Sequence, residues 1–283
     1  MTHSSGPDSY QFVSLSGADA AAFLHGQLTV DIQSMISGDV RRTAWCDASG
    51  RVLAIVHLVR DADRFILKLP GDLAEGLLKR LRMFILRASV VVEPLPDWRH
   101  ACWPAGRTPD AAALKASEMV GFCWPEASHT EIWGPEASVN RWAAANALPL
   151  EPESDLRINA GHPWVTGPVS GLYQPQMLNL HWLGGVDFRK GCYPGQEVVA
   201  RLQYRGKLKR RLYRVSSAAN VDLQAGDLIE ADGKPVGRIL EAARNEADDR
   251  LFATAVLGTT VDSPLSCRHA ELNKAQLPYP TAA

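Results

Sequence analysis

The sequence predicts an α+β protein of two or three domains that ends in a small β-barrel. Three observations lead to this prediction. The chain has 283 residues, a length that suits more than one domain. In its first third a hairpin is followed by a strand, a helix and a strand, as in a ferredoxin-like α+β sandwich. After Arg214 the pattern changes to short strands separated by turns, which is typical of a barrel.

The composition is that of a globular protein with no strong charge bias. Apolar residues make up 46% of the chain, charged residues 22%, and the formal net charge is −1. The chain is long enough to bury a core without disulfides or metal, and it has no global attraction for nucleic acid or anionic membranes. Its five cysteines are odd in number and widely spaced, which indicates reduced thiols in a reducing compartment. The first residues lack a signal-peptide pattern, and no apolar run approaches the roughly 18 residues of a membrane span. We therefore expect a cytoplasmic protein.

The first predicted unit is a strand followed by a helix. Gln11 to Leu15 form the strand, and residues 16–19 have the spacing of a helix capping box. Ala20, Leu24 and Leu28 follow on one face of an amphipathic helix.

A hairpin and a second helix come next. The turn-rich tetrapeptide Asp47-Ala48-Ser49-Gly50 separates strands over Arg42–Cys46 and Val52–Val59, and a turn at 61–63 leads to a strand over Phe65–Leu69. A helix is predicted from Pro70, with Leu73, Leu77, Leu78 and Leu81 on one side. A strand over Ala88–Val92 and a loop over 94–109 follow. The next predicted elements are a helix over Pro135–Ala147 and a short helix over Glu153–Gly161.

The last third divides into an irregular segment and the barrel. Residues 167–195 hold many Gly and Pro residues and little periodicity, and such long irregular segments are often functional. From about residue 206 we expect the barrel. Asp232-Gly233 between Leu228–Ala231 and Pro235–Leu240 is a strong hairpin signal, and strands continue over Val236–Ala243 and Leu251–Leu257.

The segment with the clearest chemical potential is 187–201. Gly191 and Gly195 bracket Cys192, and Pro194 suits the first turn of a helix. Cys192 would then lie near a helix N-terminus with Lys190 beside it, and both features favour a thiolate. The alternative is a buried cysteine that packs as a small hydrophobe. The other four cysteines lack this setting and are predicted to be structural.

A basic stretch follows the cysteine. Residues 198–221 contain no acidic side chain. They are predicted to form a solvated face, an anion site for a carboxylate-bearing ligand, or an RNA contact. The cations are Arg201, Arg205, Lys207, Lys209, Arg210, Arg211 and Arg214. Motifs of nucleotide-binding folds, zinc sites and serine hydrolases are absent, and His57, in an apolar strand, is predicted to be a satisfied core histidine.

Lys190 to Glu197 resemble a family signature, Lys-Gly-Cys-Tyr/Phe-x-Gly-Gln-Glu. The chain is thereby similar to the YgfZ family of folate-binding proteins, which are related to the glycine-cleavage T-protein. The resemblance spans nearly the whole chain. It includes Phe23–Asp31, Asp47–Leu53, Pro175–Leu180 and Tyr204–Lys207.

The resemblance implies two interleaved ferredoxin-like α+β domains and a C-terminal β-barrel around a central channel. The first domain would comprise 1–40 and 125–205 with the signature, the second 41–124, and the barrel 206–283. It also implies tetrahydrofolate, which is polyglutamylated in many cells, as the cofactor. The implied role is assembly or repair of iron–sulfur enzymes, including tRNA-thiolating ones. The expected partners are folate and these client enzymes, without membrane attachment or direct nucleic-acid binding.

The resemblance also implies the site residues. Cys192 would carry the chemistry, no metal site is expected, and Arg201, Arg205 and Lys207 would meet the glutamate tail of the folate. The cofactor-binding residues would be Gln27, Asp31, Asn159, Asn179, Lys190, Gly191, Tyr193, Gly195, Gln196, Glu197, Arg201 and Arg205.

Two other functions stay open. A folate-dependent one-carbon (aminomethyl) transferase is the enzyme alternative, but the family pattern of that enzyme has carboxylates where this chain has none. The strand Gly50–His57 carries no carboxylate, and Asn159 stands at the position of the second. An amide bonds to a pterin but cannot act as a base. Whether the protein is an enzyme is therefore left open. The third candidate is an RNA- or protein-binding module that uses the basic stretch.

Overall fold

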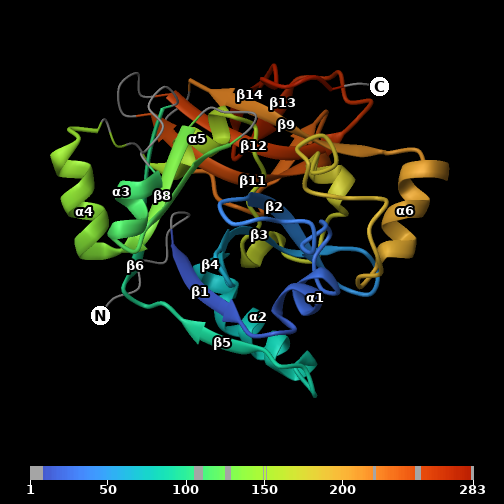
Figure 1. Cartoon of the computed structure of the whole chain (residues 1–283). Coiled ribbons are helices and arrows are strands. Elements are labelled where there is room, and N and C mark those ends of the chain that lie inside the picture. Colours follow the sequence, from blue (N-terminus) through green and yellow to red (C-terminus); the bar gives the residue numbers. More distant parts are fainter. Residues whose placement is uncertain are drawn as a thin grey trace.

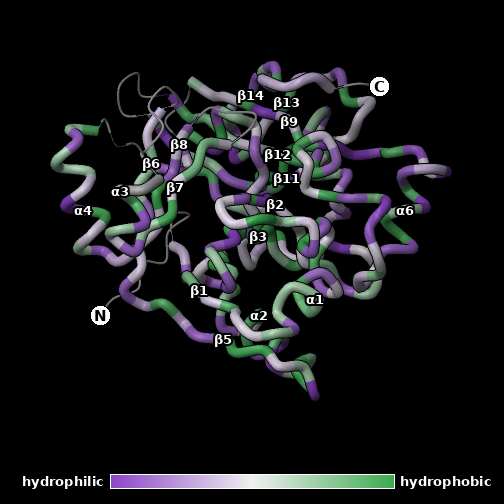
Figure 2. The backbone as a smooth tube through the Cα atoms, in the orientation of Figure 1, coloured by the Kyte–Doolittle hydropathy of each residue, from purple (hydrophilic) through white to green (hydrophobic). Residues whose placement is uncertain are grey.

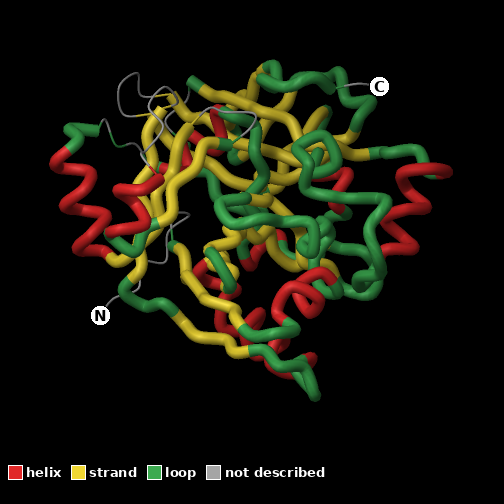
Figure 3. The backbone as a smooth tube through the Cα atoms, in the orientation of Figure 1, coloured by secondary structure: helices red, strands yellow, loops and turns green. Residues whose placement is uncertain are grey.

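The computed structural model describes residues 9–104, 111–124, 129–148, 150, 152–218, 221–245 and 250–281. Within these residues the strands form a five-stranded sheet, a three-stranded sheet and a closed barrel. Strands occupy the middle of the molecule, and helices α4 (Glu136–Ala145) and α6 (Gln196–Arg205) lie at opposite edges (Figures 1 and 3). The predicted α+β class with a C-terminal barrel is confirmed. None of the described helices combines the length and the apolar character needed to cross a membrane.

The five-stranded sheet is antiparallel, in the order β2-β3-β4-β1-β5. Helix α2 (Gly71–Phe84) buries Ala74, Leu77, Leu78 and Leu81, so the predicted apolar side of this helix is confirmed. Helix α1 (Ala20–His25) packs Leu24 into the same core. The strands are β1 (Tyr10–Ser16), β2 (Val40–Cys46), β3 (Val52–Asp61), β4 (Arg64–Pro70) and β5 (Val91–Pro94).

Two local predictions in this region were wrong. The capping box does not form, because the Asp19 carboxylate accepts the backbone N–H of Ser89 at 2.7 Å instead of one from its own helix. Helix α1 ends at His25, and Leu28, expected on its apolar face, instead forms a bridge with Trp45 of β2. Tertiary pairing thus determines where this helix ends.

The three-stranded sheet has the order β6-β8-β7. Part of the predicted loop over 94–109 is strand β6, and residues 105–109 lie outside the described part of the chain. β6 was missed because prolines flank it, although Trp98 and Trp103 are both buried. The elements are β6 (Trp98–Pro104), α3 (Ala111–Ala116), β7 (Val120–Cys123) and β8 (His129–Pro135), followed by α4, which was predicted.

The barrel closes in the order β10-β11-β12-β9-β14-β13. Its first hairpin is the predicted one, with Asp232 and Gly233 at φ 51° and 69°, which suits a tight turn. Val215, Ile239 and Ala255 belong to its own apolar core. The strands are β9 (Arg210–Ser217), β10 (Leu228–Ala231), β11 (Lys234–Asn245), β12 (Arg250–Gly258), β13 (Leu265–Cys267) and β14 (Ala270–Ala275).

The segment between α4 and the barrel joins the layers. It contains α5 (Glu153–Asn159), two short 3₁₀ turns, η1 (Gly167–Val169) and η2 (Pro175–Leu178), and α6. Trp164 and Leu178 of this segment pack with Ile55 of β3 and Leu212 of the barrel. In Figure 2 the central strand β3 is mainly hydrophobic, whereas α6 carries hydrophilic stretches at the edge. The predicted boundary between the two α+β domains falls at residues 40 and 41, and the five-stranded sheet contains strands from both sides of it. The division into two interleaved α+β domains stays a prediction.

Candidate functional site

The signature loop is fixed to the end of α1. The Lys190 ammonium donates to the backbone carbonyls of His25 and, at 2.8 Å, of Leu28. The backbone N–H of Asp187 donates to the carbonyl of Thr29 at 2.8 Å. Burial lowers the pKa of Lys190 to about 8, and nearby Asp31 and Asp187 oppose this shift. Lys190 is thus an anchor for the loop, charged at neutral pH.

Two glycines let the loop and the first hairpin touch. Gly195, with φ 79°, precedes α6, and a Cβ there would lie 2.4 Å from both the Asp47 carbonyl oxygen and the Gly50 nitrogen. Gly50, with φ 74°, faces it, and its own Cβ would lie 3.0 Å from the Gly195 oxygen. Only glycine fits both positions without a shift of backbone.

Around Cys192 the loop contains both buried and exposed positions. Tyr193 is buried, its ring lies 4.9 Å from the Lys190 ammonium, and burial raises its pKa. Gln196 donates to the Lys190 carbonyl at 3.3 Å. Cys192 itself is exposed, so it is not the buried hydrophobe of the alternative interpretation.

The other predicted residues divide into three groups. Gln27, Asp31, Lys190, Gly191 and Cys192 lie on the segments that meet at the end of α1. The second group comprises Glu197, Arg201 and Arg205, which are exposed on α6. Tyr204 on the same helix is 70% exposed. The third group, Asn159 and Asn179, lies beside the barrel.

Asn159, at the end of α5, accepts a hydrogen bond from Arg214 of β9 at 3.1 Å. Arg214 is half-buried, and burial lowers its pKa. In the described part of the chain no carboxylate lies within ion-pair distance of it, and its Nε is buried without a hydrogen-bond partner. Thr254, its cross-strand neighbour on β12, also has a buried hydroxyl without a partner. The Arg214 guanidinium on this face of the barrel is therefore a positive charge without a carboxylate partner in the described part of the chain.

Asn179 joins the same region. Its backbone is left-handed, at φ 57°, and its side-chain amide donates to the Leu212 carbonyl at 3.1 Å and to the Tyr279 hydroxyl at 3.2 Å. Tyr279 donates in turn to the Gly161 carbonyl at 2.9 Å, two residues after Asn159. The Asn179 amide oxygen is buried without a partner.

A buried ion network fills the space between the two sheets and α5. Lys68 of β4 donates to Glu131 of β8 at 2.8 Å and to Glu153 of α5 at 2.7 Å. Arg157 lies 3.1 Å from Glu153 and pairs through two nitrogens with Glu241 of β11. The carboxylates hold the pKa of Lys68 above its usual range against the effect of burial. The network thus links both sheets, α5 and the barrel.

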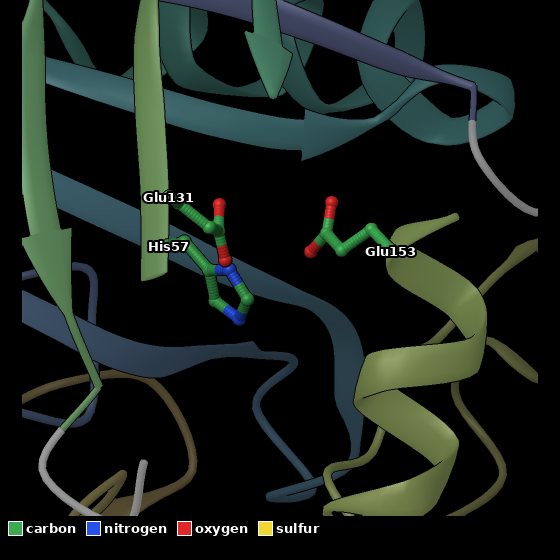
Figure 4. Close-up of side chains that lie close together, drawn as sticks. All are labelled: His57, Glu131 and Glu153. Carbon is green, nitrogen blue, oxygen red and sulfur yellow. The ribbon is translucent and has the colours of Figure 1, made fainter. Parts of the chain in front are cut away.

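His57, Glu131 and Glu153 place one potential metal-ligand atom each within 4.8 Å of one another. Figure 4 shows His57 and Glu131 side by side, with Glu153 approaching from α5. The lone pairs of Glu131 are already used. Its Oε2 accepts from Lys68 and Trp133, and its Oε1 accepts from Trp124 at 2.7 Å and from His129 at 3.0 Å. A metal ion would have to displace Lys68, so the donor set favours a closed ion network.

His57 corrects one prediction. It is buried, as expected, but both ring nitrogens lack a hydrogen-bond partner, so it is not a satisfied core histidine. Its ring contacts the rings of Trp124 and Trp164, with centroids 4.6 and 5.1 Å away. Burial, together with the charges of Lys68 and Arg42, holds its pKa well below the usual value, so it is neutral at pH 7.

Several of these residues were not identified from the sequence. One feature of the sequence could have indicated the ion network. Lys68 and Glu131 are charged residues inside apolar strands. Arg214 was noted only as part of the basic stretch. The residues missed as members of a site are His25, Lys68, Glu131, Glu153, Arg157, Arg214 and Glu241.

Comparisons with known proteins define the class first. The structure matches glycine cleavage aminomethyltransferase T from Bartonella henselae with a TM-score of 0.72 and 16% identity, over 95% of this chain and 83% of that chain. The fold is therefore that of the T-protein. No family model matches the chain.

Sequence relatives then identify the family. The tRNA-modifying protein YgfZ of Colwellia psychrerythraea is 32% identical, over 89% of this chain and 84% of the relative. The YgfZ proteins of Edwardsiella ictaluri and Escherichia coli O157:H7 are each 29% identical, over 97% and 90% of this chain and 91% and 85% of those proteins. The chain belongs to the YgfZ family.

Proposed function

We propose that this protein binds a reduced folate in the cytoplasm and supports the assembly or repair of iron–sulfur enzymes, including those that thiolate tRNA. Relatives named as tRNA-modifying proteins and the T-protein fold support this proposal. The iron–sulfur part predicts that cells lacking the protein contain less thiolated tRNA. Restoration of the thiolated nucleosides by the intact chain is the control for that measurement.

The observation that carries the folate proposal is the pair Arg214 and Asn159. The T-protein pattern has a carboxylate at position 159, which would neutralise a neighbouring guanidinium. With Asn159 in that place, Arg214 has no carboxylate partner within the described residues, and the hydroxyl of its cross-strand neighbour Thr254 is buried without a hydrogen-bond partner. Such a site favours a ligand that supplies acceptor atoms or negative charge, as a folate does.

Binding of tetrahydrofolate to the purified protein, followed by the fluorescence of its eight tryptophans, tests the proposal. We expect saturable binding, and we expect Arg214→Gln to weaken it by about 1.5–3 kcal/mol, the typical value of a hydrogen bond to a charged group. Arg210→Gln is the matched control, because Arg210 begins the same strand but is exposed. A protein that binds neither tetrahydrofolate nor its formyl derivative would contradict the proposal.

The exposed cations of α6 extend the proposal to the folate tail. Arg201 and Arg205 are exposed on helix α6, in which Glu197 is the one carboxylate residue, and guanidinium groups pair well with glutamate side chains. We expect tighter binding of polyglutamylated than of monoglutamyl folate. Arg205→Ala should remove this preference and Lys234→Ala, on the barrel hairpin, should not. Equal affinities of the intact protein for both folates would exclude a role for α6 in tail binding.

A further inference from the structure

The five-stranded sheet ends in a short strand with an open outer edge. In the described part of the chain β5 pairs with β1 alone, and Val91, Glu93 and Pro94 of β5 are exposed. β5 lies at the lower edge of the molecule, opposite the barrel strands (Figure 1). We propose that this edge binds an extended segment of a partner protein, in which acidic and apolar residues alternate, as an added strand. This binding is independent of folate, because the edge shares no residue with the Arg214 site.

The backbone of β5 has hydrogen-bonding groups that are free to pair. The N–H of Leu95 donates to the Phe12 carbonyl at 2.9 Å, in the register that continues along β5. Alternate residues of an antiparallel strand direct N–H and C=O toward the same neighbour. Glu93, two residues before Leu95, therefore bonds toward β1, whereas the N–H and C=O of Val92 point outward. Pro94 has no N–H and offers only its carbonyl at the next outward position.

A groove of about 650 Å³ lies beside this edge, between α2 and the β1–β5 pair. The residues of α2 that line it are spaced three or four apart and so share one face of the helix. They are Glu75, Leu78, Lys79, Arg82 and Met83. Val90 and Val92 pack against the core that α2 covers, so the side of β5 that carries them faces this helix. Every second side chain of an added strand would point to the same side, toward the groove.

The charges around the groove favour acidic side chains. Residues 76–92 contain four cations and no carboxylate. Of these cations, Lys79, Arg82 and Arg87 are exposed and have no ion pair within the described residues. An acidic side chain on the α2 side of an added strand would supply the missing partner. The carboxylates of α2, β1 and β5 are Asp72, Glu75 and Glu93.

The opposite side of the edge favours apolar side chains. Strand alternation places Val91 and Glu93 there, and Val91 is 51% exposed. An apolar residue of the partner would cover Val91, whereas an acidic one would meet Glu93. Three more apolar side chains, Met83, Phe84 and Leu86, are exposed in the preceding segment. Exposed apolar groups gathered in this way mark interaction surfaces.

A second copy of the chain and a membrane fit this edge less well than an acidic strand does. Pairing of two β5 strands would bring Arg82 and Arg87 of both copies together, and like charges across a strand pair are destabilising. A lipid surface has no backbone groups to pair with Val92. A strand that carries acidic residues supplies both the hydrogen bonds and the negative charge.

The probe for this edge is a fluorescein-labelled octapeptide in which Glu and Val alternate, titrated with the intact protein and followed by fluorescence polarisation. The control peptide has the same composition, four Glu followed by four Val, which places Glu on both sides of a strand. We expect saturable binding of the alternating peptide that weakens with added salt. The control peptide should bind about tenfold more weakly. Hydrogen exchange in residues 88–95 should slow on binding of the alternating peptide, because the Val92 N–H becomes bonded.

Two substitutions locate the binding on the protein. Arg82→Glu should weaken binding of the alternating peptide about tenfold, because repulsion replaces attraction. Arg141→Glu is the matched control, since Arg141 is exposed on another helix, α4, and undergoes the same change of charge. Val92→Pro removes the outward N–H without breaking a bond to β1, and it should also weaken binding.

The proposal is overturned if the intact protein binds neither peptide, if it binds both equally, or if Arg82→Glu and Arg141→Glu have the same effect. Because both arginines are exposed, these two variants decide the question even if Val92→Pro fails to fold. Two further results would assign the edge to another occupant and reject an acidic strand. One is a dimer in sedimentation that Val92→Pro dissociates. The other is binding to phosphatidylglycerol vesicles that Arg82→Glu abolishes, without binding of the peptide.

Discussion

At the scale of single residues, Lys68 should be among the least replaceable side chains in the molecule. Its ammonium is shared by Glu131 and Glu153, and all three side chains are fully buried. Lys68→Met would leave two buried carboxylates without their common partner. Since breaking a buried pair from one side costs about 3–5 kcal/mol, we expect a loss of that size in the free energy of unfolding, measured with urea.

Arg64→Met is the matched control for this loss. Arg64 lies on the same strand and pairs with Asp61 at 2.9 Å, but both side chains are partly exposed, at 35% and 27%. Exposed pairs contribute about 1 kcal/mol or less. Comparable losses in the two variants would contradict a special role for the buried network.

The same network shows why single residues are hard to place from sequence. Lys68 and Glu153 are 85 positions apart, and Arg157 and Glu241 are 84 apart, so no local pattern joins them. Asn159 and Arg214, 55 apart, meet only when α5 docks on the barrel. In contrast, the glycines around Cys192 could be identified from sequence because glycine has a local role. It permits a backbone conformation or a close approach that other residues do not.

At the scale of elements, the contact between Gly195 and Gly50 determines how α6 and its loop dock on the β2–β3 hairpin. Gly195→Ala would combine a left-handed alanine with backbone atoms at 2.4 Å. The first effect alone costs about 1–2 kcal/mol, and the contact must add to it because the opposing atoms are backbone. We expect a loss above about 3 kcal/mol in unfolding free energy.

Gly184→Ala separates the two effects. Gly184 has a similar φ, 66°, and no atom within 4 Å of its would-be Cβ, so it reports the conformational cost alone. Its loss should stay within about 1–2 kcal/mol. If Gly195→Ala were no more destabilising than Gly184→Ala, the close approach of the two glycines would not contribute.

Elements were predictable where their signals were local. The strands flanking Asp47–Gly50, helix α2 and the Asp232-Gly233 hairpin follow from turn residues and apolar spacing, and each is confirmed. Strand β6 was missed because prolines near Trp98 suggest a loop, yet pairing with β8 holds it extended. The end of α1 was misplaced because Leu28 leaves the helix to pair with Trp45.

At the scale of the whole molecule, the family resemblance implied a folate channel and the sequence indicated a reactive loop, but neither showed that a buried centre of two neutral histidines accompanies the ion network. His57 and His162 belong to this centre and are both buried. Burial, with Arg42 nearby, holds the pKa of each well below 6.5. In the unfolded chain both histidines regain their ordinary pKa, and this difference makes the stability of the whole fold depend on pH.

The sign follows from proton binding. Below pH 6.5 the unfolded chain binds protons at His57 and His162 that the folded protein excludes, so stability should fall with pH by about 1.4 kcal/mol per pH unit for each histidine. Below pH 4.5 Glu153 adds to the loss, since its ion pairs lower its pKa to about 2 in the fold. Urea unfolding from pH 8 to pH 4 measures this slope. His57→Gln should remove about half of it above pH 5, whereas His269→Asn, an exposed histidine, should leave it intact. A stability that stays constant between pH 7 and pH 5 would mean that the buried centre accepts protons without opening, and that its histidines do not make the fold sensitive to acid.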